Sequence, residues 1–176
     1  MATSVAGFAG NTGAAPADDW REMVDACAAF LETGAFTEPE DMTLTGRRDL
    51  GEDHLLCFDS LALDARPVPG CNVIEATFEG RSYAGLELQW REDAASPDSF
   101  ERAKCFPNST RMESRKGIPD ALSSWFKEAE ASGRVVAVKE HVWDGCSRSG
   151  RKWRVAHAHE FGPILWFSSL KSPCNS

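Results

Sequence analysis

The fold is decided by residues 72–90, NVIEATFEGRSYAGLELQW, in which apolar and polar side chains alternate around a central glycine. Such alternation is typical of β-strands, because successive side chains point to opposite faces of a sheet. The even positions 74–78 share one face of the first strand, and the even positions 82–90 share one face of the second. Even positions must therefore pair with even positions, which requires an odd number of turn residues. We predict an antiparallel hairpin with Glu79-Gly80-Arg81 as its turn.

Helical periodicity occurs in two separate stretches of the chain. Apolar side chains recur at three- and four-residue steps over residues 18–33, and again over residues 119–132. This spacing places them on one stripe of a helix, which has to be buried against another element. The stripe residues are Trp20, Met23, Val24, Cys27, Phe30 and Leu31 in the first helix, and Leu122, Trp125, Phe126 and Ala129 in the second.

Further strand-like runs complete the predicted secondary structure. They cover residues 42–45, an apolar segment over 54–63, a strand near 100–106, and three C-terminal runs over 135–143, 152–161 and 164–170. Two helices with six to eight strands, and no regular βαβ alternation, favour the α+β class. We predict a curved, mainly antiparallel sheet packed on the long N-terminal helix and on the second helix near 119–132.

The domain organisation follows from the same reading of the chain. Residues 1–17 are mostly Ala, Gly, Ser and Thr without a charge, which predicts a flexible tail. We expect a single α+β domain over residues 18–172 and a short C-terminal tail over 173–176. The sequence contains no internal repeat.

Composition and charge exclude several classes of protein. The chain has 176 residues, of which 42% are hydrophobic, and this suits one compact domain. Its net charge of −8 at pH 7 repels phosphate backbones, so we expect no nucleic-acid partner. No apolar run reaches about 20 residues, the length that crosses a bilayer, so we expect no membrane partner.

The cellular compartment and the thiol state are predicted from the N-terminus and from the six cysteines. Residues 1–17 lack the basic start and apolar core of a secretory signal, so we expect a cytoplasmic protein. No C-x-x-C pair indicates a zinc ribbon or a redox motif, and free thiols are the expected state in the cytosol. The cysteines are Cys27, Cys57, Cys71, Cys105, Cys146 and Cys174.

The candidate chemistry centres on two C-terminal strands. Pairing the apolar faces of residues 135–143 and 152–161 places Glu140 diagonally across from His157. An ionisable pair on an apolar face is costly unless its members satisfy each other or line a cavity. Three interpretations stay open: a buried Glu–His hydrogen bond that only stabilises the fold, polar contacts in a ligand pocket, or a catalytic acid–base pair.

Four further residues are candidates for ligand contacts. Trp153 and His159 share the inward face with His157, Val138 is expected opposite His157, and Trp166 lies on the last strand. The His157-x-His159 spacing offers two imidazoles, but a metal site needs a third ligand and the Glu of the cupin pattern is absent. We therefore expect no metal and no cofactor.

Residues 150–159, GRKWRVAHAH, resemble the late strand of NTF2-like (SnoaL-like, cystatin-type cone) domains, in which a Gly, a Trp and a closing His-x-His occur in this order. The strand expected over 138–143 and the segment 117–122, GIPDAL, fit the same pattern. The resemblance is limited to the C-terminal third and implies a cone-shaped fold with an apolar cavity. Members include lyases, isomerases, cyclases and non-catalytic binding modules, and no catalytic set carries over.

These observations support three hypotheses for the function. The first is a binding module whose aromatic-rich interior offers a partly apolar pocket or sheet face to a small apolar molecule or a protein partner. The second is a cofactor-independent lyase or isomerase with Glu140 as base, His157 as proton shuttle and Trp153 as a pocket wall. The third is a regulatory interaction protein that forms a homodimer. Basic side chains also gather at the turn between the strands predicted over 135–143 and 152–161. They suit an acidic partner or are simply a solvated turn: Arg148, Arg151, Lys152 and Arg154.

Overall fold

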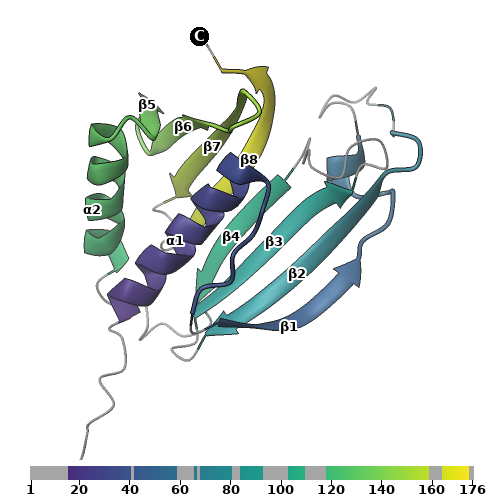
Figure 1. Ribbon diagram of the computed structural model, residues 1–176, viewed down its shortest axis with the longest axis horizontal. Coiled ribbons are helices and arrows are strands. Elements are labelled where there is room, and N and C mark those ends of the chain that lie inside the picture. The colour runs from purple at the N-terminus through teal and green to yellow at the C-terminus, as the bar shows by residue number, and fades with distance from the viewer. Residues whose placement is uncertain are drawn as a thin grey trace, which may run out of the picture.

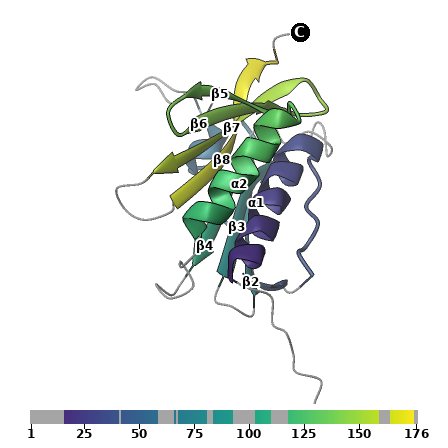
Figure 2. The ribbon, with the colours of Figure 1, turned by 90° about the vertical axis from the view of Figure 1, so that its left-hand side faces the viewer.

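The computed structural model describes residues 16–40, 42–58, 66, 68–80, 84–92, 103–109, 118–158 and 164–174. Within this part, an eight-stranded antiparallel sheet carries two helices on one face (Figures 1 and 2). The predicted α+β class is confirmed. The predicted tail lies outside the described residues up to position 15, and β8 extends into the predicted C-terminal tail as far as Pro173.

Both helices form where the apolar stripes predict them. Helix α1 spans Pro16–Thr33 and α2 spans Ile118–Ala131. The short 3-10 helix η1 occupies Leu55–Cys57, where the sequence shows only an apolar run whose later residues, 59–63, lie outside the described part. The strands are β1 Met42–Asp49, β2 Asn72–Gly80, β3 Ala84–Glu92, β4 Ala103–Ser109, β5 Val135–Lys139, β6 Val142–Cys146, β7 Arg151–Ala158 and β8 Ile164–Pro173.

The connectivity repeats itself along the described chain. One helix followed by four strands occurs twice, first as α1 with β1 to β4 and then as α2 with β5 to β8. The strand order β1-β2-β3-β4-β8-β7-β6-β5 joins the two halves through their last strands. Cys105 on β4 lies opposite Phe167 on β8 at this central pair. The fold therefore contains a repeat of topology that the sequence does not reveal.

The β2–β3 hairpin confirms the predicted pairing of even positions. Ala76 lies opposite Leu88 and Phe78 opposite Leu86, and all four side chains are buried. Pairing continues to Glu79 and Gly85, so the connection falls at residues 81–83, which lie outside the described part, rather than at the predicted 79–81. The predicted position was wrong by two residues. Glycine favours turns, but Gly80 is here the last residue of strand β2.

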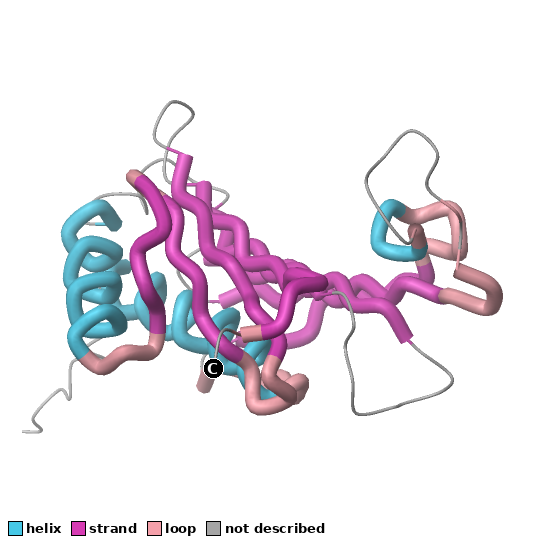
Figure 3. Tube along the Cα trace, turned by 90° about the horizontal axis from the view of Figure 1, so that it is seen from above, coloured by secondary structure: helices cyan, strands magenta, loops and turns pink. Residues whose placement is uncertain are grey.

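Both helices pack on the face of the sheet that carries these apolar residues (Figure 3). Helix α1 lies over β3, β4 and β8, and α2 lies beside α1 and against β5 (Figure 2). The predicted stripe of α1 is buried in full, and so is that of α2. No helix in the described part of the chain is long and apolar enough to cross a membrane.

All six cysteines form disulfides, so the predicted free thiols are wrong. The pairs are Cys27–Cys105, Cys57–Cys71 and Cys146–Cys174. The first joins α1 to β4, with a Cα–Cα distance of 5.5 Å across 78 residues of sequence. Partners so distant in sequence meet only in the folded chain, which is why cysteine spacing alone could not reveal them.

Candidate functional site

The C-terminal strands have a different register from the predicted one. The chain reverses at Glu140 and His141, where His141 takes a positive φ of 59°, so the predicted strand 135–143 is in fact two strands, β5 and β6. β6 and not β5 pairs with β7, and this pairing places Val142 opposite Ala156. The prediction was wrong because a two-residue turn without Gly, Pro or Asn leaves the apolar alternation uninterrupted.

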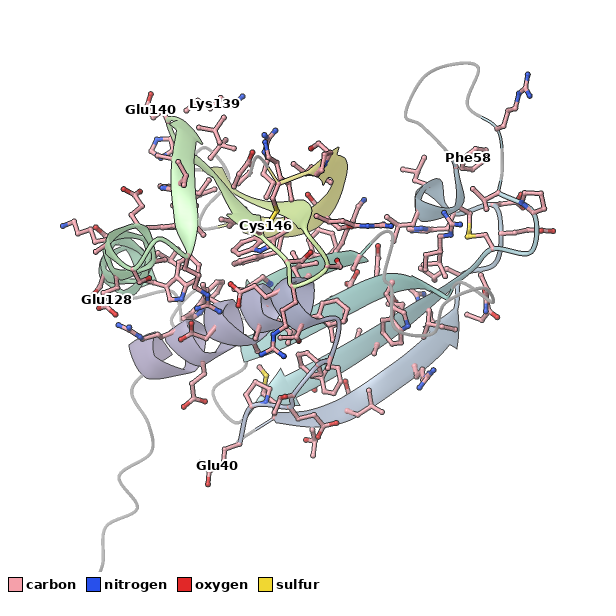
Figure 4. The ribbon with its side chains drawn as sticks, turned by 45° about the horizontal axis from the view of Figure 1, so that its top comes forward. Glu40, Phe58, Glu128, Lys139, Glu140 and Cys146 are labelled. Carbon is pink, nitrogen blue, oxygen red and sulfur yellow. A yellow bond between two sulfur atoms is a disulfide. The ribbon has the colours of Figure 1, made fainter. Side chains whose placement is uncertain are left out.

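Glu140 and Val138 consequently lie away from their predicted partners on β7. Glu140 is at the hairpin tip, where its side chain is 88% exposed (Figure 4), and Val138 is 52% exposed on the edge strand β5. Glu140 lies against His141, whose ring in turn meets that of the half-buried His157. The Glu140 carboxylate lies 3.3 Å from His141 Nε2, and the rings of His141 and His157 meet edge to face at 6.0 Å. The tip does not bring Glu140 beside His157 in a cavity.

The remaining predicted site residues divide into two groups. Trp153 is buried at 1% exposure and lines a pocket. His159 lies outside the described residues, and for Trp166 only the backbone is described, which pairs with Ala156.

This pocket opens between the C-terminal end of α1 and the connection from β6 to β7. Its volume is about 250 Å³, and β4 and β8 contribute the remaining walls. Cys146, at the end of β6, marks this side of the molecule in Figure 4. The lining residues come from α1 and the residue after it (Phe30, Leu31, Glu32, Thr33, Gly34), from the two central strands (Ala103, Ser169), and from the connection and β7 (Ser147, Arg148, Ser149, Arg151, Lys152, Trp153).

The end of α1 holds the connecting turn in place. Gly34, with a φ of 77°, terminates the helix and donates its N–H to the Phe30 carbonyl at 2.9 Å. The backbone carbonyl of Glu32, in the last turn of α1, accepts the N–H of Arg148 at 2.8 Å. The Glu32 carboxylate is bound by Arg134 at 2.7 and 3.2 Å. Helix end and turn therefore form one connected wall of the pocket.

The turn is further held by its own hydrogen bonds and by a disulfide. Ser147 donates its N–H to the Arg151 carbonyl at 2.8 Å, and its hydroxyl accepts the N–H of Arg151 at 3.0 Å. The Cys146–Cys174 disulfide joins the turn to the end of β8, where the Cys174 N–H donates to the Gly150 carbonyl at 2.8 Å. These bonds order the mouth of the pocket before any ligand arrives.

The floor of the pocket is apolar and the mouth is polar. Phe30, Ala103 and Trp153 are each at most 2% exposed, and they form the deep surface. Ser169 adds a hydroxyl, but its Oγ already accepts the N–H of Ala103 at 2.7 Å. A ligand that enters this space would bury an apolar part on the floor.

Positive charge gathers at the mouth. Arg148, Arg151 and Lys152 line it, whereas Arg154, the fourth member of the predicted basic cluster, binds Asp144 at 2.6 and 3.0 Å. The hydrogen bonds that Arg154 donates to Asp144 raise the pKa of Arg154, so this residue is committed to a structural pair.

A second cluster of ionisable groups lies on the sheet face opposite the helices. Glu75 is buried at 5% exposure, binds Arg48, and accepts a hydrogen bond from Gln89 at 3.0 Å; Gln89 also donates to Glu87 at 2.8 Å. Burial acts to raise the pKa of Glu75, but the bonds from Arg48 and Gln89 outweigh it and lower that pKa. Burial and the charge of Glu75 raise the pKa of Glu87. These contacts describe a saturated polar cluster rather than an open site.

Sequence reasoning identified Trp153 and the basic turn but missed the partners that α1 supplies. Phe30 and Leu31 belong to the helix stripe, so their pattern indicates core packing and not a pocket wall. The basic turn next to Trp153 was the sequence signal for the pocket. That the end of α1 faces this turn becomes visible only in the folded structure.

No protein-family model, no curated protein and no solved structure matches this chain. The resemblance of its C-terminal third to NTF2-like domains therefore stays a prediction. Among the residues that the structure describes, no group of three or more His, Cys, Asp and Glu side chains is placed to hold a metal ion.

Proposed function

We propose that this protein is a binding module that holds a small organic molecule in the pocket between α1 and the β6–β7 connection. The observation that carries the proposal is a pocket of about 250 Å³ with a buried aromatic floor and a polar, ordered mouth. At roughly 30 Å³ for a water-sized group, the space suits a ligand of about eight such groups. Concave sites with an apolar lining and few polar contacts are typical of small-molecule binding.

The lining favours binding over the lyase or isomerase alternative. Glu32 is the acidic residue among the pocket residues, and its carboxylate is already bound by Arg134. Glu140 and His157, the pair that the enzyme hypothesis requires, are not among the residues that form this pocket.

The proposal includes an oxidising compartment in place of the cytoplasm expected from the sequence. Three disulfides are formed, and one of them, Cys146–Cys174, fastens the turn that forms the pocket mouth. Disulfides persist in oxidising surroundings and are rare where thiols are kept reduced. In an oxidising compartment the Cys146–Cys174 disulfide stays intact and keeps the turn at the pocket mouth in place.

Filling the pocket tests the proposal. Ala103 lies on the floor, so Ala103→Leu places extra carbons inside the space, while Ala137→Leu adds the same carbons on the exposed strand β5. The probes are 1-octanol and octanoate, whose eight carbons match the size of the pocket. Binding is measured by the rise in the midpoint of thermal unfolding, which saturating ligand increases through mass action.

We expect at least one probe to raise the unfolding midpoint of the wild type and of Ala137→Leu, and neither to raise that of Ala103→Leu. The unliganded midpoints of both variants are recorded first, so that loss of stability is separated from loss of binding. If neither probe stabilises the wild type, or if both still stabilise Ala103→Leu, the pocket is not the binding site.

A further inference from the structure

We infer that the Cys146–Cys174 disulfide is a redox-sensitive clasp on the pocket. A dithiol reductant opens it in the folded protein, and the open clasp loosens the mouth and weakens ligand binding. The inference rests on the proposed function and adds a means of regulating it. It starts from the position of this disulfide at the surface, beside the turn that forms the mouth; Cys146 is labelled in Figure 4.

The three disulfides differ in their access to a reductant. In the clasp, Cys146 is exposed and Cys174 is half-buried. The cysteines of the other two pairs are each at most 6% exposed: Cys27, Cys105, Cys57 and Cys71. Exchange requires a thiolate to reach a sulfur atom, and exposed disulfides are the labile ones. A reductant can therefore reach the clasp without unfolding the protein.

The exchange reaction balances with a dithiol as the reductant. One thiolate of the dithiol attacks the Sγ atom of Cys146, the S–S bond breaks, and Cys174 leaves as a thiolate that takes up a proton. The second thiol of the reductant then displaces Cys146 from the mixed disulfide, and Cys146 also takes up a proton. Two electrons and two protons pass to the protein, and the reductant becomes a disulfide.

The clasp fastens the end of β8 to the turn between β6 and β7. Arg151 lies opposite Pro173, and the Cys174 N–H donates to the Gly150 carbonyl at 2.8 Å. Pairs at the end of a strand open more readily than pairs inside a sheet. Without the covalent bond, we expect the end of β8 to separate from the turn and the hydrogen bond to Gly150 to be lost.

Loss of this attachment affects the mouth directly. Arg148 and Ser149 line the pocket and lie within the turn. The hydrogen bonds between Ser147 and Arg151 hold the shape of the turn, whereas its position on α1 depends on contacts such as the bond from the Arg148 N–H to the Glu32 carbonyl. If the open clasp leaves the mouth ordered for about a tenth of the time, the ligand binds about tenfold more weakly.

Selective reduction of the wild type tests the inference. Folded protein is incubated with dithiothreitol, samples are alkylated at intervals, and peptide mapping gives the rate of reduction of each disulfide. We expect the clasp to be reduced about tenfold faster than either buried pair. Trypsin then probes the turn, because it cleaves after arginine and Arg148 and Arg151 lie there. Protein with only the clasp reduced should be cleaved in the turn about tenfold faster than oxidised protein.

Binding of octanoate and 1-octanol is measured by calorimetry on oxidised and clasp-reduced wild type. Each probe that binds the oxidised protein should bind the reduced protein about tenfold more weakly. Cys146→Ser/Cys174→Ser should reproduce the weaker binding and show no further change with dithiothreitol. The control Cys57→Ser/Cys71→Ser removes the disulfide at η1 and should keep the wild-type affinity. The unfolding midpoints of both variants are recorded first, and the wild-type measurements decide alone if a variant does not fold.

The outcomes separate this inference from the proposed function. If a buried pair is reduced as fast as the clasp, or if clasp-reduced protein resists trypsin or keeps its affinity for the probes, the inference is wrong while the binding pocket stands. If neither probe binds the oxidised wild type, the proposed function fails and regulation of binding fails with it. The rates of reduction and of trypsin cleavage then still decide whether the disulfide controls the turn.

Discussion

The indole ring of Trp153 lies directly against the Cα atom of Gly145, the residue opposite it on β6. A Cβ atom at Gly145 would overlap the ring carbons Cε2 and Cζ2. The ring has little room to retreat, because Trp153 is 1% exposed and stacks on Phe167 with 6.1 Å between centroids. Gly145 is therefore needed for its missing side chain, and this contact supports the tryptophan at the pocket floor.

We expect Gly145→Ala to destabilise the protein by about 1–3 kcal/mol, the usual cost of forcing extra atoms into a packed core. Without a clash, alanine in a strand would instead stabilise the fold slightly, because the unfolded chain loses freedom. Urea unfolding gives the free energy. In a Trp153→Phe background the smaller ring leaves space, so the same glycine substitution should cost clearly less. An equal cost in both backgrounds would show that the contact is not responsible.

The three disulfides lead to a prediction about covalent state and stability. The unreduced, denatured protein should contain no titratable thiol, and peptide mapping should recover Cys27–Cys105, Cys57–Cys71 and Cys146–Cys174. A disulfide that closes a longer loop removes more conformational entropy from the unfolded chain and so stabilises the fold more. Sequence separations of 78 and 14 residues correspond to about 4.5 and about 3 kcal/mol of stabilisation. Cys27→Ser/Cys105→Ser should therefore lower the free energy of unfolding more than Cys57→Ser/Cys71→Ser. The reverse order would mean that native contacts, and not chain entropy, decide the ranking.

Arg134 joins the two helices more strongly than any exposed pair would. Its guanidinium binds Glu32 and Asp25, the latter at 2.7 Å, and lies 5.6 Å from the ring centroid of Trp125. Burial acts to lower the pKa of Arg134, but the hydrogen bonds that it donates to the two carboxylates outweigh this effect and raise that pKa. Trp125 also donates its indole N–H to Asp25 at 2.8 Å.

Arg134→Met should therefore cost about 1–3 kcal/mol, since it removes a charged donor from the half-buried carboxylates of Glu32 and Asp25. Arg21→Met is the matched control, because Arg21 also links α1 to α2, through Glu128, but with side chains 41% and 56% exposed. An exposed pair contributes about 0–1 kcal/mol. Chemical denaturation of both variants measures the difference. Equal losses would contradict the structural importance of the Arg134 cluster.

The elements of this fold could largely be predicted, because each depends on local periodicity. The stripe that includes Trp20 and Cys27 predicts α1, and the alternation around Phe78 predicts the paired faces of β2 and β3. Alternation also predicted that Trp153 points inward, and it is 1% exposed. Local patterns carry this information because burial repeats with the geometry of each element.

The candidate site could not be predicted, because its parts come from separate halves of the chain. The reversal at Glu140 contains no glycine or proline, so the alternation ran through it and gave β7 the wrong neighbour. Arg148 meets Glu32 only when the turn docks on the end of α1. Long-range contacts of this kind depend on topology, which the alternation of a single strand does not contain.

The Glu75–Glu87 pair predicts an unusual dependence of stability on pH. The pKa of Glu87 is raised by burial and by the charge of Glu75, whereas the unfolded chain has the ordinary value of about 4.3. Between these two pKa values the folded state binds more protons than the unfolded state, so stability falls as the pH rises through this window. The pKa of Glu75 is lowered, so its contribution has the opposite sign and is lost as the pH falls below the ordinary value.

Glu87→Gln should remove the first effect and keep the second. The amide cannot ionise, yet its oxygen still accepts from Gln89, so the polar cluster remains intact. The free energy of unfolding, measured from about pH 4 to about pH 7, should decline less steeply in this variant than in the wild type. Glu79→Gln, at an exposed position on β2, the strand that carries Glu75, should keep the wild-type profile. If Glu87→Gln follows the wild-type profile as well, Glu87 ionises in the folded protein as easily as in the unfolded chain. Burial and repulsion by Glu75 would then not raise the pKa of Glu87.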